Sequence, residues 1–274
     1  VIDGVCLRIC MLLVFKAAWQ YRHFVWSSIK SELRGKYANS GLGGAWMILH
    51  PLAQAAVLAV VLSQLLGARL SGIDSDYAYA IYLLAGVVGW NLFAETSAAA
   101  ISMFRDRANL LKKVNFPRVC IPMIVVGTAL LNHVIFLVVV ILLTWALGLQ
   151  PSTSLALLGV AVLVNLALAL GFGLVLSIFD AFNRDIGHFW SVVTQLWFWL
   201  TPIVYSRDVL PASLETLMVY NPAYSVVSLY QKAIAFQQLD FDTGLFLPIS
   251  VAALLLIIGF FLFIRASSDI VDAL

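Results

Sequence analysis

Long apolar runs alternate with short polar segments along this chain. A helix needs about 20 apolar residues to cross the hydrocarbon core of a bilayer, and six runs approach or exceed that length. The pattern predicts six membrane spans, at about 44–67, 78–103, 119–148, 155–179, 188–205 and 245–264. Pro122 falls in the first turn of the third span, where a proline is tolerated because its missing N–H has no helical partner.

A different pattern precedes the first span. Between about 15 and 36, apolar residues recur at three- and four-residue steps, and basic and polar residues fill much of the remainder. The apolar set comprises Phe15, Trp19, Trp26, Ile29 and Leu33. This spacing predicts an amphipathic helix lying in the membrane interface. The alternative is a soluble amphipathic helix packed on a partner.

The segment 206–244, between the fifth and sixth spans, is too broken by Pro211 and Pro222 to form one span. It contains two short amphipathic pieces, about 211–219 and 222–236, with Asn221-Pro222 as the turn between them. Non-helical backbone at membrane depth is tolerated only inside protein or beside a water-filled cavity. We therefore predict a re-entrant hairpin of two short helices that enters the outer leaflet from outside.

Basic residues are distributed unevenly between the two sides of this arrangement. Of the 16 Lys and Arg residues, only Arg69, Arg207 and Lys232 fall in the predicted outer segments. The others lie in 1–43, in the loop 104–118, at Arg184 and at Arg265. Because cytoplasmic loops carry the excess of Lys and Arg, both termini are predicted to be cytoplasmic.

Composition agrees with a membrane protein. Hydrophobic residues make up 62% of the 274 residues, charged residues only 11%, and the mean hydropathy is +0.99, whereas soluble domains are roughly a quarter charged. We expect a single all-α transmembrane domain over 1–274. The net charge of +2 alone neither indicates nor excludes nucleic acid. No such partner is expected, because the basic residues lie in loops and not along one soluble face.

The sequence lacks the motifs of several enzyme classes. It has no G-x-x-x-x-G-K-[ST] phosphate loop, no G-x-S-x-G elbow and no H-E-x-x-H pair. The three cysteines and four histidines are too scattered to suggest a metal site. A membrane-bound glycosyl- or acyltransferase would need acids or histidines clustered near the interface, and none is visible. We expect no catalytic residue, metal or cofactor in this chain.

Glu95 is the only carboxylate within the predicted spans. An acid in hydrocarbon is expensive, so its side chain should face the bundle interior or a polar partner. A structural partner across helices, a pore-facing position and a role in proton coupling all remain open. His133 is one candidate partner, although helical rise places the two residues at depths that differ by about 9 Å.

Aromatic residues crowd the fifth span. They are Trp190, Trp197, Phe198, Trp199 and Tyr205. Residues 197–199 lie in mid-span, so an interfacial aromatic belt does not account for them. Two interpretations remain open: packing in the core or against lipid, and a lining for a carbohydrate path in which sugar rings stack on aromatic planes.

The loop 104–118 reads FRDRANLLKKVNFPR and holds five of the basic residues around Leu110 and Leu111. A short amphipathic helix at this position would bind anionic lipid through its charges or insert into a groove of a soluble partner.

Four segments, taken in order, point to one family. They are LRGKYANSGLGGAWMILHPL at 33–52, NLLKKVNFPR at 109–118, FNRDIGHFWSVVTQLWFWLTPIVY at 182–205 and YNPAYSVVSLYQ at 220–231. Together they resemble the membrane (permease) subunits of ABC-type polysaccharide exporters, above all those for O-antigen. The resemblance covers nearly the whole chain.

The resemblance implies a channel-forming subunit that moves polyprenyl-pyrophosphate-linked O-antigen polysaccharide across the bacterial cytoplasmic (inner) membrane. It implies a homodimer paired with two copies of a separate ATPase subunit, which would bind ATP and Mg. The alternatives are a related exporter of teichoic acid or capsule, or of a lipid or small drug. A non-transport scaffold would not need the outer hairpin.

The resemblance also implies roles for individual residues. The loop 104–118 would couple to the ATPase through Arg105, Arg107, Asn109, Leu110, Leu111, Lys112, Lys113 and Val114. The glycan path would be lined by Glu95 and the aromatic residues of the fifth span. Arg34, Lys36 and Tyr37 would form a cytoplasmic rim that meets the pyrophosphate of the substrate. The hairpin would form an outer gate that includes Pro211, Asn221, Pro222 and Tyr224.

Overall fold

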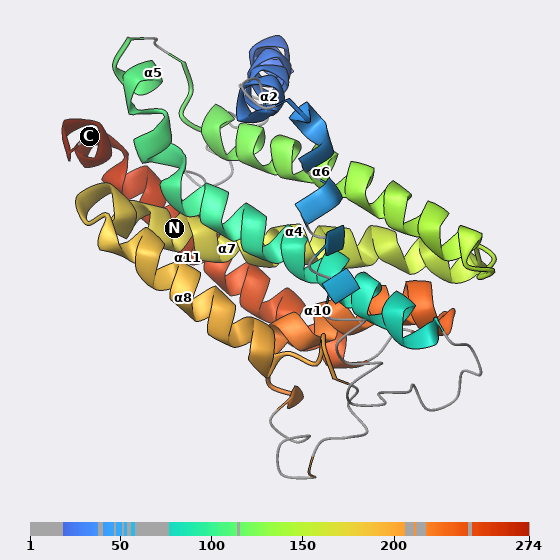
Figure 1. Ribbon diagram of the computed structural model, residues 1–274. Coiled ribbons are helices and arrows are strands. Elements are labelled where there is room, and N and C mark those ends of the chain that lie inside the picture. Colours follow the sequence, from blue (N-terminus) through green and yellow to red (C-terminus); the bar gives the residue numbers. More distant parts are fainter. Residues whose placement is uncertain are drawn as a thin grey trace.

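The computed structural model describes residues 19–37, 41–46, 48–50, 52–53, 56–57, 77–113, 116–205, 211, 218–240 and 243–273. Within these ranges the secondary structure is entirely helical. Four long helices pack together (Figure 1): α4 (Ala78–Asp106), α6 (Cys120–Ala146), α7 (Leu157–Phe182) and α11 (Phe246–Ala273). The shorter helices are α2 (Arg22–Tyr37), α5 (Ala108–Lys113), α8 (Asp185–Leu200) and α10 (Pro222–Gln231).

Four helices in the described part of the chain are long and apolar enough to cross a membrane: Ala78–Asp106, Cys120–Ala146, Thr153–Phe182 and Phe246–Arg265. They correspond to the second, third, fourth and sixth predicted spans, and they confirm an all-α membrane protein. The fifth predicted span corresponds to α8, whose 16 residues extend only about 24 Å. Most of the first predicted span lies outside the described residues. The total of six spans therefore stays a prediction.

Helix α4 lies at the centre of the bundle and packs against α6, α7, α8 and α10. Two glycines permit its closest contacts. A Cβ atom on Gly89 would lie 2.7 Å from the ring of Tyr230 in α10, and one on Gly173 of α7 would lie 2.2 Å from the Cβ of Ala100. Small residues let membrane helices approach closely enough to gain dispersion contacts. The close packing of α4 therefore depends on glycines on two neighbouring surfaces.

The ends of several helices follow from local sequence. Helix α8 ends at Leu200 because Thr201 precedes Pro202 and takes an extended conformation with ψ 132°. Gly148, with φ +93°, follows the end of α6. A glycine with positive φ commonly ends a helix at this position, because it has no side chain to oppose that backbone conformation. The N-terminal proline of α10 is likewise tolerated in the first turn.

Helix α2 packs against α6. Its buried residues are Val25 and Ile29, whereas Trp19 and Trp26 are exposed. A basic side chain lies over each of these exposed rings, at 4.9 Å for Arg22 on Trp19 and 5.3 Å for Lys30 on Trp26. This helix falls within the predicted interfacial segment 15–36, and its location in the membrane interface stays a prediction.

Helix α10 is buried among α4, α7 and α11, with Leu229 and Tyr230 fully covered. It continues into a π-helical turn at Lys232–Phe236. Of the first predicted hairpin piece, 211–219, the structure describes only residues 211, 218 and 219. The re-entrant hairpin therefore stays a prediction. Figure 1 places α10 at the opposite end of the bundle from α5 and from the C-terminal end of α11.

Candidate functional site

The basic loop is a helical corner rather than an open loop. Its first residues, 104–106, belong to α4, and α5 follows after a break of one residue. Leu110 and Leu111 are half-buried and pack against a cluster shared with α2, α6 and α11. Lys112 and Lys113 are exposed. The side chain of Asn109 and all of Val114 lie outside the described residues.

Arg107 connects this corner to two other helices. Its Nη2 atom donates to Glu32 Oε1 of α2, and Thr128 Oγ1 of α6 donates to Glu32 Oε2 at 3.0 Å. Its Nη1 atom also donates to the carbonyl of Met103 at 3.3 Å. The Arg107 side chain is only 13% exposed. Arg107 therefore stabilises the corner from within rather than presenting its charge to a partner.

Arg105 connects the end of α4 to the α7–α8 turn. Its Nη1 atom donates to Asp180 Oδ2 at 2.5 Å, and Asp180 Oδ1 accepts from the backbone N–H of Gly187 at 3.1 Å. The Asp180 side chain is 1% exposed. The fourth span was predicted to end at residue 179, which left Glu95 as the only carboxylate in a span. Helix α7 continues to Phe182, so the helix itself also contains Asp180.

The aromatic residues of α8 divide into two sets. Trp190 and Phe198 are buried and Trp197 is half-buried. Trp197 packs edge-on against Phe93 of α4 and Phe172 of α7, with ring centroids 5.3 and 5.7 Å apart. The indole nitrogen of Trp190 donates to Ser97 Oγ at 2.9 Å, inside the core. The buried set therefore attaches α8 to the bundle.

The second set faces outward. Trp199 is 53% exposed, and Tyr205 is half-buried with its hydroxyl donating to the carbonyl of Trp199 at 3.1 Å. Phe189, Val192 and Leu196 are exposed at helical spacing on α8. Trp199 is thus the most exposed aromatic residue of the predicted glycan path, and the path itself stays a prediction.

Asn221 ties the end of α8 to the start of α10. Its Oδ1 atom accepts from the backbone N–H groups of Ala223 and Tyr224, at 3.1 and 3.4 Å, and so caps α10. The same oxygen accepts from the indole of Trp197 at 2.9 Å, while Nδ2 donates to Thr201 Oγ1 at 3.2 Å. A residue predicted for the outer gate is therefore bonded to one predicted for the glycan path.

The remaining predicted residues of the outer gate and the cytoplasmic rim differ in their exposure. Pro222 and Tyr224 are half-buried at the start of α10, and Pro211 is exposed. In the predicted rim, Arg34 is exposed on α2. Lys36 and Tyr37 belong to the last turn of α2, and their side chains lie outside the description.

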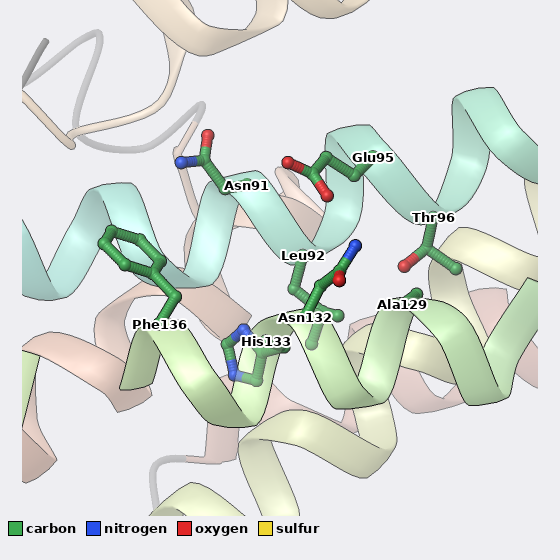
Figure 2. Close-up of a pocket in the computed structure, with 8 residues that line it drawn as sticks. All are labelled: Asn91, Leu92, Glu95, Thr96, Ala129, Asn132, His133 and Phe136. Carbon is green, nitrogen blue, oxygen red and sulfur yellow. The ribbon is translucent and has the colours of Figure 1, made fainter. Parts of the chain in front are cut away.

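A small polar cleft separates α4 from α6 (Figure 2). Glu95 and His133 both line it, together with Asn91, Leu92, Thr96, Ala129, Asn132 and Phe136. Its volume is about 20 Å³, enough for a single water molecule. His133 Nε2 lies 3.2 Å from the hydroxyl of Tyr230. Helix packing thus brings Glu95 and His133 to one cleft although their predicted depths differ.

Glu95 itself is exposed. Among the described residues, the buried atoms Thr96 Oγ1 and Asn132 Oδ1 have no hydrogen-bond partner. A water in the cleft would satisfy both, because bound water usually pairs with otherwise unsatisfied buried groups. The cleft fits a hydration site better than a binding site for a larger molecule.

Several connecting residues were not singled out from the sequence. Glu32 and Asp180 pair with arginines that lie 75 residues away along the chain, and spacing alone does not predict such contacts. One signal was available for Asp180, since an acid directly after a long apolar run is unusual. Arg184 and His188 stand in the R-D-I segment before the aromatic run, but no partner for them was evident from sequence.

Comparisons with known proteins agree with this architecture. The model of the ABC-2 type transporter family matches residues 23–235. The O-antigen export system permease protein RfbA of Myxococcus xanthus is 27% identical over 223 residues, which are 81% of this chain and 84% of that protein. Two proteins of the same name from Klebsiella pneumoniae are 27% and 26% identical over 198 residues, covering 72% of this chain and 74% of each relative.

Proposed function

Because the chain belongs to the ABC-2 type transporter family, we propose that it is the channel-forming subunit of an exporter of polyprenyl-pyrophosphate-linked O-antigen polysaccharide. In this proposal two copies enclose the channel in the inner membrane, and both termini lie in the cytoplasm. Two separate ATPase subunits bind ATP and Mg. This chain contributes neither a nucleotide site nor a metal site.

The observation that carries the proposal is the position of α5. The helix lies between α4 and α6 in the chain, and Arg107 and Arg105, which both precede α5, bond to α2 and to α7. A force applied to α5 by a partner would therefore reach three other helices through side-chain bonds. Lys112 and Lys113 are exposed for docking. Such a corner suits a subunit that receives motion from an ATPase.

The outward face of α8 supports the channel part of the proposal. A stripe of large apolar side chains on one face of a short helix requires lipid or another copy of the chain as cover. Trp199 lies on this stripe and offers a flat surface on which sugar rings can stack. We place this face towards the channel, where the second copy completes the enclosure.

An export assay tests the proposal. A strain lacking this gene would be complemented with the chain alone, with its ATPase alone, and with both, and glycan at the outer surface would be measured. We expect long surface glycan only with both subunits. Normal surface glycan in the deletion strain, together with altered sensitivity to small drugs, would contradict it and favour a small-molecule exporter.

Coupling through α5 has its own test. Glu32→Gln weakens the bond to Arg107 without removing the side chain. We expect this change to reduce export while the ATPase still co-purifies with the chain. Arg107→Gln should add little to the effect of Glu32→Gln, since the two residues act as one pair. Fully additive losses would contradict this role for the pair, and Lys30→Gln on the exposed face of α2 is the matched control.

A further inference from the structure

A second cleft lies at the α5 end of the bundle, between α4 and α8. It has a volume of about 460 Å³ and is lined by Ala98, Ile101, Ser102, Arg105, Arg184, Gly187 and His188. This volume falls within the range of about 300–1,000 Å³ that is usual for small-molecule sites. The cleft is more than twenty times larger than the one beside Glu95, so it has room for a charged group as well as water.

Basic side chains make up most of its polar lining. Two guanidinium groups and an imidazole line the cleft, whereas no carboxylate does so among the described residues. Arg105 is fixed by its bond to Asp180, and its Nη2 atom lies 3.9 Å from the position of a Cβ atom on Gly187. Arg184 and His188 are exposed and form no ion pair within the described ranges.

The acidic groups nearby leave Arg184 as the cation of the cleft without an ion-pair partner among the described residues. Asp180 offsets the charge of Arg105 through their ion pair and also accepts from the backbone of Gly187. Asp106 is exposed and accepts from Ser102 Oγ, a group that lines the cleft, at 2.6 Å. Asp185, at the start of α8, is exposed and is not one of the lining residues. The cleft therefore presents Arg184 and His188 as uncompensated donors.

The chemistry of these donors suits an anion such as phosphate. Guanidinium groups bind phosphate oxygens with paired, charge-assisted hydrogen bonds, which are stronger than bonds between neutral groups. The apolar stripe on α8 continues from His188 through Phe189, Val192 and Leu196, which are 65%, 55% and 60% exposed. A cationic pocket at the end of an apolar helix face matches an amphiphile with an anionic head and a hydrocarbon chain.

We propose that the α4–α8 cleft binds the phosphate or pyrophosphate group of a lipid, with Arg184 and His188 as its principal contacts. Arg105 is the fixed cation at the back of the cleft. The inference deepens the proposed function and rests on it for the membrane side on which the cleft opens. Two sources share this chemistry: the pyrophosphate of a polyprenyl-linked substrate, and the headgroup of an anionic phospholipid.

Binding of farnesyl pyrophosphate tests the site. The full chain would be co-purified with its ATPase, reconstituted in phosphatidylcholine nanodiscs, and titrated with the probe. We expect the double variant Arg184→Gln/His188→Gln to bind at least about tenfold more weakly than the unchanged chain, because two charge-assisted contacts are lost. Arg184→Lys should give an intermediate affinity, since lysine keeps the positive charge but cannot donate the two parallel hydrogen bonds of a guanidinium group.

Arg265→Gln is the matched control. It removes one exposed positive charge outside the cleft, so it should leave the affinity unchanged. Arg184 and His188 are exposed, and co-purification with the ATPase verifies that the double variant is folded. Equal affinity of the double variant and the unchanged chain would overturn the site, as would an equal loss in Arg265→Gln.

A second titration distinguishes the two sources. Phosphatidylglycerol would replace part of the phosphatidylcholine in the nanodisc. If it weakens probe binding to the unchanged chain but not to the double variant, the site accepts bilayer headgroups. If it has no effect, the site selects pyrophosphate. The export assay is independent, because binding of farnesyl pyrophosphate requires no transport. If the double variant binds the probe as tightly as the unchanged chain while the native chain exports glycan normally, the proposed site is wrong and the proposed function is unaffected.

Discussion

The indole nitrogen of Trp197 donates a hydrogen bond of 2.9 Å to the side-chain oxygen of Asn221. The two residues belong to α8 and to the cap of α10, and Asn221 also bonds to Thr201. One amide thus fixes how the C-terminal end of α8 meets the following helix. Removing this amide should therefore weaken the packing of both helices.

We predict that Asn221→Ala lowers the stability of the purified protein. Loss of a helix N-cap costs about 1 kcal/mol, and the half-buried indole of Trp197 loses its acceptor in addition. Thermal unfolding in detergent, followed by tryptophan fluorescence, should show a lower Tm. Asn221→Asp retains the acceptor oxygen and should recover part of the loss. An unchanged Tm in Asn221→Ala would contradict the capping role.

Arg105 and Asp180 should respond unequally to substitution. Arg105→Ala leaves the Asp180 carboxylate buried without its cation, which costs about 3 kcal/mol in comparable buried pairs. Asp180→Asn leaves Arg105, whose side chain is 30% exposed and has access to solvent, so it should cost less. Tm values of the two variants measure this order. The reverse order would show that the buried carboxylate is not the sensitive partner.

Two glycines of the same helix offer a matched pair. A Cβ atom on Gly173 would lie 2.2 Å from Ala100, whereas one on Gly159 would meet nothing within 4 Å. We predict that Gly173→Ala destabilises the bundle by about 1–3 kcal/mol, because overpacking forces α4 and α7 apart. Gly159→Ala should be neutral or slightly stabilising, since alanine favours helix. Similar Tm values for both variants would contradict the close contact.

The two sets of aromatic residues on α8 should separate stability from transport. Trp197→Ala removes a half-buried ring from the core and should cost about 3 kcal/mol. Trp199→Ala should change stability by less than about 0.5 kcal/mol, as is usual at exposed positions, yet reduce surface glycan severalfold if sugar stacks there. Trp199→Phe should restore export. Normal export by Trp199→Ala would remove this residue from the glycan path.

Much of the fold could be predicted from the apolar runs. The four described spans begin and end within a few residues of their predicted bounds, apart from the last, which continues to Ala273. The start of α10 at Asn221-Pro222 was also predicted from local sequence, because the proline and the capping asparagine are neighbours in the chain. The fifth span was predicted to run to residue 205, whereas α8 ends at Leu200, before Thr201-Pro202.

Contacts between distant segments could not be predicted in the same way. Glu32 and Arg107 stand in segments that sequence patterns treat separately, and only the packing of α2 on α6 brings them together. The sequence left both core packing and a glycan path open for Trp190 and Trp197, because hydropathy does not tell which face of a helix another helix covers. In the structure, Phe93 and Phe172 pack against both of these rings.

The contacts of Asp180 limit how three helices can move relative to one another. A single carboxylate accepts from Arg105 at the end of α4 and from the backbone of Gly187 in α8, while its own backbone belongs to α7. This carboxylate therefore holds α4, α7 and α8 together at one corner. If one of these helices moved away, the buried charge of Asp180 would lose a partner. We expect this corner to tilt as a single block when α5 is pushed. If the chain exports a polymer as proposed, we expect the opening for it on the side of α8 that faces away from this corner.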